Sequence, residues 1–179
     1  MFAVVFEVLP SPSGYQRYLD TAAALRPRLD GIEGFVSIER FRCLTAPGWI
    51  LSLSYWRHEA ALVAWRGHGE HHAAQQAGRG GVFDDYRLRV VRMHDKFPAA
   101  PAQSLIVLQD DPPERDSGRR FQSLANESRL IGLADVNAEA VADDDTASRH
   151  GMRFGEVLRD YGLFDRLQAP QRFPAVSRQ

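Results

Sequence analysis

The sequence predicts an α+β protein whose secondary-structure elements follow the ferredoxin-like order. Two observations in the first 95 residues carry this prediction. Apolar and polar residues alternate along segments bounded by Gly and Pro, as in strands, and apolar residues recur at helical spacing between those segments. In chain order the segments form a strand, a helix, two strands, a helix and a strand, which is the split β-α-β arrangement.

The first strand is expected over residues 2–9, because FAVVFEVL is rich in β-branched and aromatic residues and a proline follows it. A helix is expected over residues 13–29, where Tyr15 and Leu19 stand at helical spacing. Gly31 is a suitable residue to end this helix.

The next two strands are expected over residues 34–44 and 49–57, where apolar and polar residues alternate. TAPG at residues 45–48 is rich in residues that favour turns, so the two strands should form an antiparallel hairpin. Residues 58–81 indicate a helix in two pieces, divided near two glycines, and residues 82–94 indicate the fourth strand.

The chain is expected to divide into a first domain over residues 1–95, a linker over 96–103 and a C-terminal region over 104–179. The prolines and alanines of the middle segment indicate the linker. The C-terminal region is either an extension or a degenerate second repeat that lacks one strand of the hairpin. Its expected elements are strands over 104–110, 129–136 and 152–164, a loop with a helix as the alternative over 112–128, and a short helix over 137–148.

The composition is that of an ordinary globular chain and argues against two classes of partner. The 179 residues are 44% hydrophobic and 25% charged, with a net charge of −1, so no basic field attracts nucleic acid or an anionic membrane. No apolar run approaches the ~20 residues of a membrane span, and the N-terminus lacks the basic start of a signal peptide. With Cys43 as the single cysteine, these features predict a cytoplasmic protein.

Six blocks of the first 95 residues resemble the antibiotic biosynthesis monooxygenase family in sequence and in order. They are FAVVFEVLP, YLDTAAALRPRL, GFVSIERF, GWILSLSYWRHEAALVAWR, EHHAAQQAGR and FDDYRLRV. EVLRDYGLFDRLQAP, at residues 156–170, is similar to the segment that follows the last strand in this family. The resemblance implies a dimeric α+β barrel, in which the sheet of a ferredoxin-like subunit packs on the sheet of a second subunit. A homodimer is therefore expected.

The predicted sheet also has one face that needs a cover. Along the strand at residues 34–44, Phe35, Ser37, Glu39 and Phe41 form a half-apolar face that a single copy would expose. Either a second subunit or the C-terminal half must supply that cover.

Members of this family oxidise aromatic polyketides without a cofactor, degrade haem or have no assigned chemistry. The resemblance therefore implies, as the leading hypothesis, a cofactor-independent monooxygenase that uses dioxygen on a small aromatic or polyketide-like substrate. A non-catalytic ligand-binding or stress-associated barrel is the alternative. Haem binding or degradation is less favoured, because the first strand lacks the asparagine of the haem-degrading relatives.

The stretch WRGHGEHHAAQQAGR, at residues 65–79, contains the candidate catalytic residues. Trp65 should either line a pocket between helix and sheet or anchor the helix in the core. His72 or His71 is the candidate base, because imidazole exchanges protons near neutral pH, and at most one of these neighbours should face the pocket. His68 and His72 have a spacing known from metal sites, but no metal site is predicted because the HExxH pattern is absent.

The candidate substrate-binding residues come from the strands. Phe6, Tyr55 and Phe83 are expected to form the apolar wall of the pocket. Arg87 and Arg89 are expected to hold a phenolate or carboxylate by paired hydrogen bonds.

A structural role is the alternative for these two arginines. Leu88 and Val90 should face the helices, so the arginines between them point to the other face of the sheet, where ion pairs with Glu39 or Asp85 are expected. Arg40, which also lies on a strand, has the same two interpretations.

Overall fold

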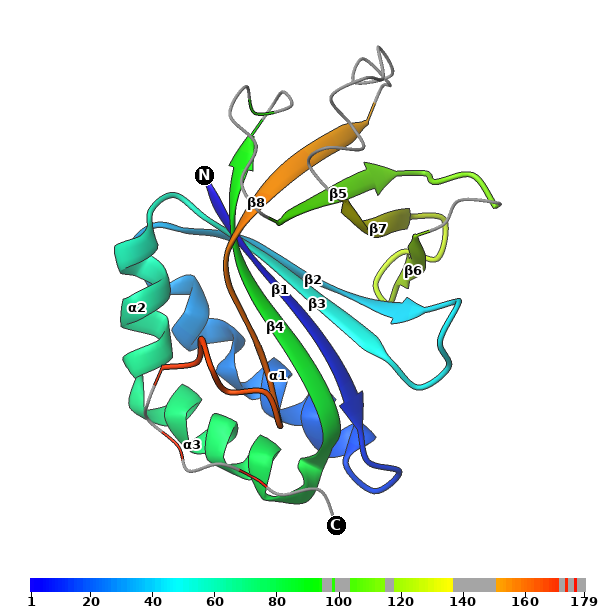
Figure 1. The fold of residues 1–179 in the computed structure, drawn as a ribbon. Helices are drawn as coiled ribbons and strands as arrows, with labels where there is room; N and C mark the ends of the chain where they lie inside the picture. The colour runs from blue at the N-terminus through cyan, green and yellow to red at the C-terminus, as the bar shows by residue number, and fades with distance from the viewer. Residues whose placement is uncertain are drawn as a thin grey trace.

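The chain folds into a closed barrel of eight antiparallel strands with its helices packed on one side (Figure 1). This computed structural model describes residues 1–94, 98, 104–114, 118–136, 151–170, 173 and 176. The α+β fold predicted from the sequence is confirmed.

The first half contains the predicted β-α-β-β-α-β order. Its elements are β1 (Phe2–Pro10), α1 (Tyr15–Asp30), β2 (Phe35–Cys43), β3 (Ile50–Trp56), α2 (Glu59–Gly67), α3 (Gly69–Ala77), the π-helical turn η1 (Gly78–Val82) and β4 (Phe83–His94). The second helical region is divided as expected, because His68 between α2 and α3 has an extended backbone conformation.

The second half supplies four more strands: β5 (Leu105–Asp110), β6 (Arg119–Ser123), β7 (Leu130–Val136) and β8 (Met152–Gly162). The sequence predicted a loop, with a helix as the alternative, over residues 112–128. This prediction was wrong for residues 119–123, which form β6. Its sequence, RRFQS, contains a single large apolar residue, Phe121, which is 1% exposed in the barrel core. The helix predicted over 137–148 lies outside the described residues, and so does the predicted linker over 96–103, apart from residue 98.

The two halves repeat one strand order. Around the barrel the strands run β1-β3-β2-β6-β7-β5-β8-β4, so each half is a four-stranded sheet in the same order and the halves join where β2 meets β6 and β4 meets β8. The sequence predicted that the second half lacks one strand of the hairpin. This was wrong, because β6 takes the position in the second half that β2 has in the first. The second half thus covers the sheet of the first half from within the same chain.

The barrel interior is apolar over most of its length. Alternate residues of each strand point inward and form one core cluster, which includes Val5, Leu51, Phe41, Ile106 and Phe121. Phe41, predicted to lie on a sheet face that needs a cover, is fully buried in this cluster.

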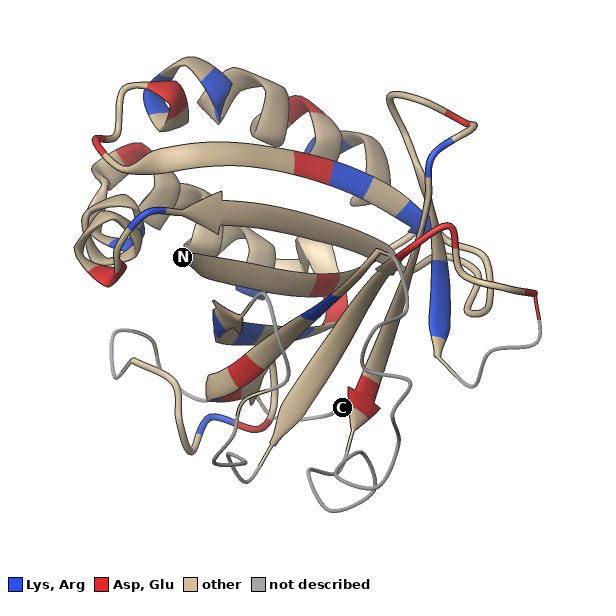
Figure 2. Ribbon diagram, turned by 90° about the horizontal axis from the view of Figure 1, so that it is seen from above, with Lys and Arg blue, Asp and Glu red and all other residues tan. Residues whose placement is uncertain are grey.

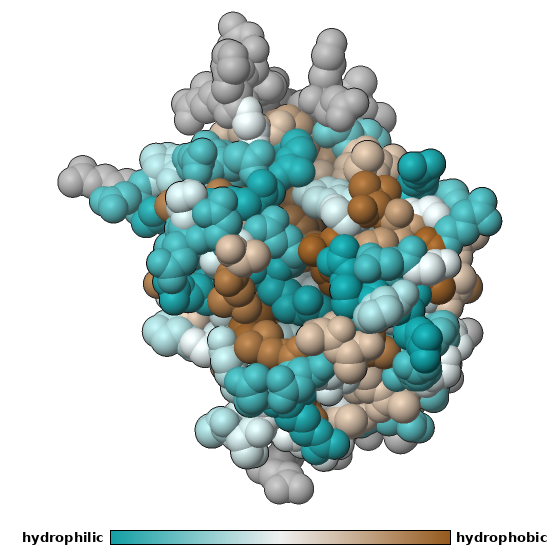
Figure 3. Space-filling view, turned by 180° about the vertical axis from the view of Figure 1, so that it is seen from behind, coloured by the Kyte–Doolittle hydropathy of each residue, from teal (hydrophilic) through white to brown (hydrophobic). Residues whose placement is uncertain are grey.

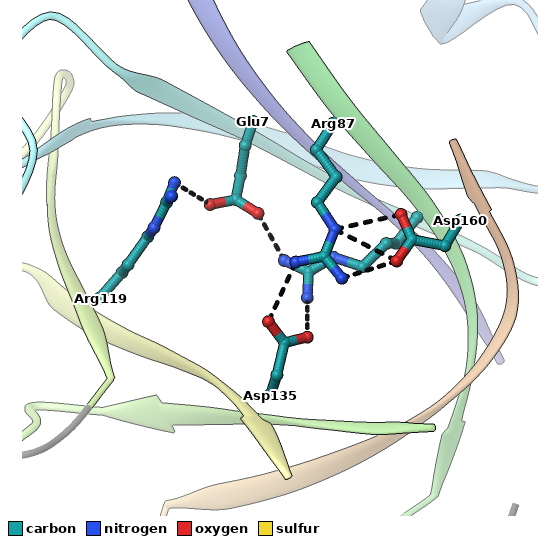
Figure 4. A network of polar contacts seen from close by, with 6 residues as sticks. Glu7, Arg87, Arg119, Asp135 and Asp160 are labelled. Atoms are coloured by element: carbon teal, nitrogen blue, oxygen red, sulfur yellow. Dashed lines mark hydrogen bonds and ion pairs between the residues drawn. The ribbon is translucent and has the colours of Figure 1, made fainter. Parts of the chain in front are cut away.

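One end of the interior is instead charged (Figure 4). Arg89 is 1% exposed and donates hydrogen bonds to Glu7, which is 3% exposed, and to Asp135. Arg119 donates to Glu7 over 2.7 Å, and Arg87 bridges Asp135 and Asp160 over 3.0 and 2.6 Å. Apart from the pair of Arg89 and Glu7, each of these ion pairs joins a residue of the first half to one of the second half.

The ion-pair partners predicted for the two arginines of β4 were wrong. Glu39 instead forms an ion pair with Arg129 over 3.1 Å, and the Asp85 carboxylate accepts a hydrogen bond from the backbone N–H of Tyr86. The predicted direction of the arginines was right, because Leu88 and Val90 face the helices.

We expect light scattering at micromolar concentration to give the mass of one chain. The half-apolar sheet face that predicted a homodimer is covered by β5–β8, and in the view of Figure 3 hydrophobic residues stand in patches between hydrophilic ones. A mass twice that of the chain would contradict this expectation and would require an interface on another surface. Dimerisation itself stays an untested prediction.

Candidate functional site

A cavity of about 250 Å³ lies between the helices and the outer face of the first-half sheet. Figure 2 shows the helical layer covering this face of the strands. The cavity has a mainly apolar lining, which is typical of sites for small organic molecules.

Strand register arranges the cavity floor in two rows that cross the sheet. The first row contains, from β8 to β2, Tyr161, Leu88, Phe6, Ser52 and Arg40. The second row contains Arg159, Val90, Val4, Ser54 and Ile38. Apolar side chains of β4 and β1 thus occupy the middle of the floor, and polar or charged ones flank them on β8 and β3, with Arg40 and Ile38 on β2 at the outer edge.

An aromatic cluster forms one wall of the cavity. The ring of Phe6 lies 5.9 Å from that of Phe83 and 5.6 Å from that of Tyr86, and Tyr18 contacts Phe83 edge-on at 5.5 Å. Phe6 and Phe83 were predicted to form such a wall, and both line the cavity.

Trp65 and His71 lie together on the helical side of the cavity. Their rings stack with centroids 4.3 Å apart and planes 14° from parallel. His71 Nδ1 lies 3.0 Å from the carbonyl oxygen of Trp65. A carbonyl only accepts hydrogen bonds, so Nδ1 carries the proton and Nε2 keeps its lone pair.

Burial lowers the pKa of His71 to about 4, and the nearby His68 and His72 lower it further, while the hydrogen bond to the Trp65 carbonyl raises it. His71 is therefore neutral at pH 7. Its remaining ring nitrogen, Nε2, is the atom that can accept a proton from a molecule in the cavity.

The free energy of unfolding should fall as the pH decreases from about 6.5 to about 4. In this window the unfolded chain binds a proton at His71 that the folded chain does not, which costs at most about 1.4 kcal/mol per pH unit. Urea unfolding at several pH values, compared with His71→Gln, isolates this contribution from that of the carboxylates. An identical pH dependence in both proteins would contradict it.

The other two histidines of this stretch lie differently. The His72 ring stacks on Phe173 at 4.7 Å and does not belong to the cavity lining that the described residues form. His68 stands in the break between α2 and α3, so it shares no continuous helix with His72. This break removes the geometric basis for a metal site at these two positions.

Three predicted substrate-binding residues point to the opposite face of the sheet. Arg87 and Arg89 belong to the charged cluster inside the barrel. The Tyr55 hydroxyl accepts a hydrogen bond from Arg153 over 2.7 Å, and burial raises its pKa. None of the three lines the cavity in the part of the chain that the structure describes.

The second half contributes lining residues that sequence reasoning missed. They are Arg159, Tyr161, Arg166, Pro170 and Phe173, from β8 and the segment after it, which returns to the helices in Figure 1. Burial raises the pKa of Tyr161. Only the family-like block at residues 156–170 could have indicated their importance.

Two of the cavity arginines meet at one tyrosine. Arg79 and Arg166 donate to the Tyr86 hydroxyl over 3.0 and 2.9 Å. This contact ties η1 to the C-terminal segment at the cavity wall.

Other kinds of site find less support among the described residues. Within those residues, no three His, Cys, Asp or Glu side chains are grouped closely enough to hold a metal ion. No helix in the same residues is long and apolar enough to cross a membrane. Cys43 is buried in the barrel core, with its sulfur 3.4 Å from the Thr45 hydroxyl.

Comparison with known proteins identifies the family. The jasmonate monooxygenase ABM of Pyricularia oryzae (strain 70-15) is 34% identical over 215 residues, which cover 99% of this chain and 100% of that protein. The chain belongs to the antibiotic biosynthesis monooxygenase family. The model of that family matches residues 1–77. The resemblance seen in the sequence is thereby confirmed.

Two further comparisons gave weaker matches. The uncharacterized protein YqjZ of Bacillus subtilis (strain 168) is 32% identical over 92 residues, which cover 51% of this chain and 78% of that protein. A crystal structure of a putative monooxygenase from Lactobacillus acidophilus covers 88% of this chain and 92% of its own, at 7% identity and a TM-score of 0.49.

Substitution Trp65→Phe should remove most of the fluorescence quenching caused by an aromatic ligand such as 1-naphthol. Trp65 lines the cavity, so its indole should stack on the ligand, a contact of roughly 0.5–1.5 kcal/mol. The melting temperature should change little. Trp49→Phe is the control, because Trp49 packs against the barrel core. Trp56 also lines the cavity, so quenching as strong in Trp65→Phe as in the wild-type protein is the result that would assign Trp65 a packing role alone.

Proposed function

We propose that this member of the antibiotic biosynthesis monooxygenase family is a cofactor-independent monooxygenase. Its substrate is a small aromatic or polyketide-like molecule, bound between the helices and the first-half sheet. One observation carries the proposal: a neutral histidine, with its tautomer set by the Trp65 carbonyl, lines an apolar cavity.

In this reaction the substrate itself supplies the electrons. A base removes a proton from a substrate carbon, and the resulting carbanion or phenolate adds to dioxygen as a peroxide, which takes up a proton. Loss of the second proton from that carbon breaks the O–O bond, so that one oxygen atom stays on the carbon as a carbonyl and the other leaves as water. The protein therefore needs a base, a site with little water and hydrogen-bond donors for the oxyanion.

We assign the base role to His71 rather than His72. His71 Nε2 is unprotonated at pH 7, and the stacked Trp65 ring fixes the plane of the imidazole. The low pKa makes His71 a weak base, so the imidazolium must be stabilised by the anion that it creates. Proton transfer is then favourable only with the substrate held against the ring.

The oxyanion can be held by cations of the cavity wall. Arg66 lies on α2 next to Trp65, and Arg159 and Tyr161 reach the cavity from β8. In an apolar site such donors stabilise a developing negative charge more strongly than water does.

The cytoplasm, predicted from the single cysteine and the lack of a signal peptide, is the proposed location.

Oxygen uptake by the purified protein tests this function. The substrates are a panel of hydroquinone-like compounds and jasmonate, because a relative is named for jasmonate. With ¹⁸O₂, one labelled atom should appear in the product and one in water. Uptake should need no added metal or flavin and should persist in the presence of a chelator.

Two other outcomes would favour the alternatives. A ligand that binds in the cavity without oxygen uptake would favour a ligand-binding barrel. A Soret band in the purified protein would favour haem binding. A colourless protein that consumes oxygen with a panel substrate supports the proposed reaction.

A further inference from the structure

The cavity has a strongly one-sided charge. In the part of the chain that the structure describes, the lining residues include no Asp, Glu or Lys. They do include seven arginines, namely Arg17, Arg26, Arg40, Arg66, Arg79, Arg159 and Arg166. A chain with a net charge of −1 has thus gathered about a third of its 22 basic residues around one apolar site. Such a field favours an anionic ligand.

Several of these arginines already have partners that account for them. Arg26 pairs with Asp30 and Arg159 with Glu59, both outside the lining. These two pairs reduce the charge that the cavity receives from α1 and β8.

Arg40 is the lining arginine that carries the inference. It is half-buried at the β2 edge of the floor, and its guanidinium lies 5.8 Å from the Tyr18 ring. Its Nε is shielded from water and has no hydrogen-bond partner, and no carboxylate of the described residues lies within 4.0 Å of the guanidinium. A partly desolvated cation without a counter-ion is costly, so an anion at its two Nη groups would be stabilising.

Ser52 adds a neutral donor beside this cation. Ser52 is directly opposite Arg40 in the register of β2 and β3, is 7% exposed and lines the cavity. Opposite residues on one sheet face have Cβ atoms about 4.5–5.5 Å apart. An arginine and a serine whose Cβ atoms are this close can share one carboxylate, with the planar guanidinium binding both oxygens.

The floor also sets how such a ligand lies. From the row of Arg40, the next row of the floor contains Ile38, and the row after it contains Trp56 at the end of β3. Trp65 packs in the same cluster as Trp56, so this direction leads to the Trp65 side of the cavity. Each two-residue step along a strand is about 6.7 Å, so the Trp56 row lies roughly 13 Å from the Arg40 row. A molecule with its anion at Arg40 would place its other end near Trp65 and His71.

We infer that the cavity binds an amphipathic carboxylic acid, whose carboxylate is held by Arg40 and Ser52 and whose apolar body extends toward Trp65 and His71. Arg40 is thereby a specificity-determining residue. This inference rests on the proposed function in taking the cavity as the substrate site, and it names the chemical class of that substrate.

A matched pair of probes tests the inference without turnover. Isothermal titration at pH 7.5 compares 5-phenylpentanoate with 5-phenylpentanamide, which has the same skeleton and no charge. We expect the wild-type protein to bind the acid at least ~10-fold more tightly, since hydrogen bonds to charged groups contribute roughly 1.5–3 kcal/mol. Arg40→Gln should remove this preference and leave the affinity for the amide within about twofold.

Arg42→Gln is the control. Arg42 lies two residues further along β2, is exposed and contacts Gln122 and Glu127 outside the cavity. It should keep the full preference for the acid. Equal binding of acid and amide by the wild-type protein would overturn the inference even if Arg40→Gln failed to fold, and so would a preference that survives in a folded Arg40→Gln.

The two proposals fail separately. An acid preference that depends on Arg40, together with no oxygen uptake on any substrate, would reject the monooxygenase function and keep the binding inference. Oxygen uptake with neutral aromatic substrates, together with no acid preference, would reject this inference alone.

Discussion

Substitution of His71 by alanine is expected to lower oxygen-dependent turnover by roughly 10²–10⁴-fold, which is the usual contribution of a general base. His71 is the histidine of its stretch that lines the cavity, and its Nε2 is free of the proton that Nδ1 carries. The loss should appear in kcat more than in KM, because the base acts in the transition state of proton transfer. Oxygen-electrode rates at saturating substrate measure it.

The pH profile separates a base from a packing residue. With the pKa of His71 near 4, the wild-type rate should be level from about pH 5 to 8 and fall toward pH 4. His72→Ala is the matched control and should change turnover little, because His72 stacks on Phe173 and does not itself line the cavity. Equal, small effects of both substitutions would leave His71 without a catalytic role.

Substitution Arg89→Met should destabilise the fold by roughly 3–5 kcal/mol, the usual cost of removing one partner from a buried ion pair. Glu7 would remain 3% exposed, with half-exposed Arg119 as its main cation. Arg89 also connects Glu7 on β1 to Asp135 on β7, so the substitution removes a contact between the two halves. Urea unfolding measures the change in free energy.

Arg92→Met is the control on the same strand. Arg92 is half-exposed and pairs with Glu156 over 3.0 Å, so its loss should cost about 0–1 kcal/mol. The double substitution Glu7→Leu with Arg89→Met should cost less than the sum of the single ones, because it leaves no unpaired buried carboxylate. A cost for Arg89→Met as small as that for Arg92→Met would show that the cluster does not hold the halves together.

The elements of the first half could be predicted from the sequence, because their signals are local. Alternation over residues 2–9 and 82–94 specified β1 and β4, and it also showed that Leu88 faces the helices and Arg89 the opposite side. Helical spacing placed Trp65 on the face that meets the sheet. The family resemblance followed from the same blocks, and it extends the expectation from fold to chemistry.

The role of the second half depends on contacts between residues far apart in the chain. RRFQS has no local period that indicates a strand, and β6 forms because Phe121 is buried between β2 and β7. The partners of Arg89 lie 46 and 82 residues away, so spacing could not select Asp135 and Glu7 over Glu39 and Asp85, the acids that were predicted.

Which of the two neighbouring histidines faces the cavity also depends on tertiary contacts. His71 and His72 have the same chemistry and almost the same place on α3, and sequence shows only that they face different ways. The break at His68 sets the rotation of α3 against α2 and stacks His71 on Trp65. Burial then lowers the pKa of His71, because desolvation depends on the sheet, helix and C-terminal segment that fold around it.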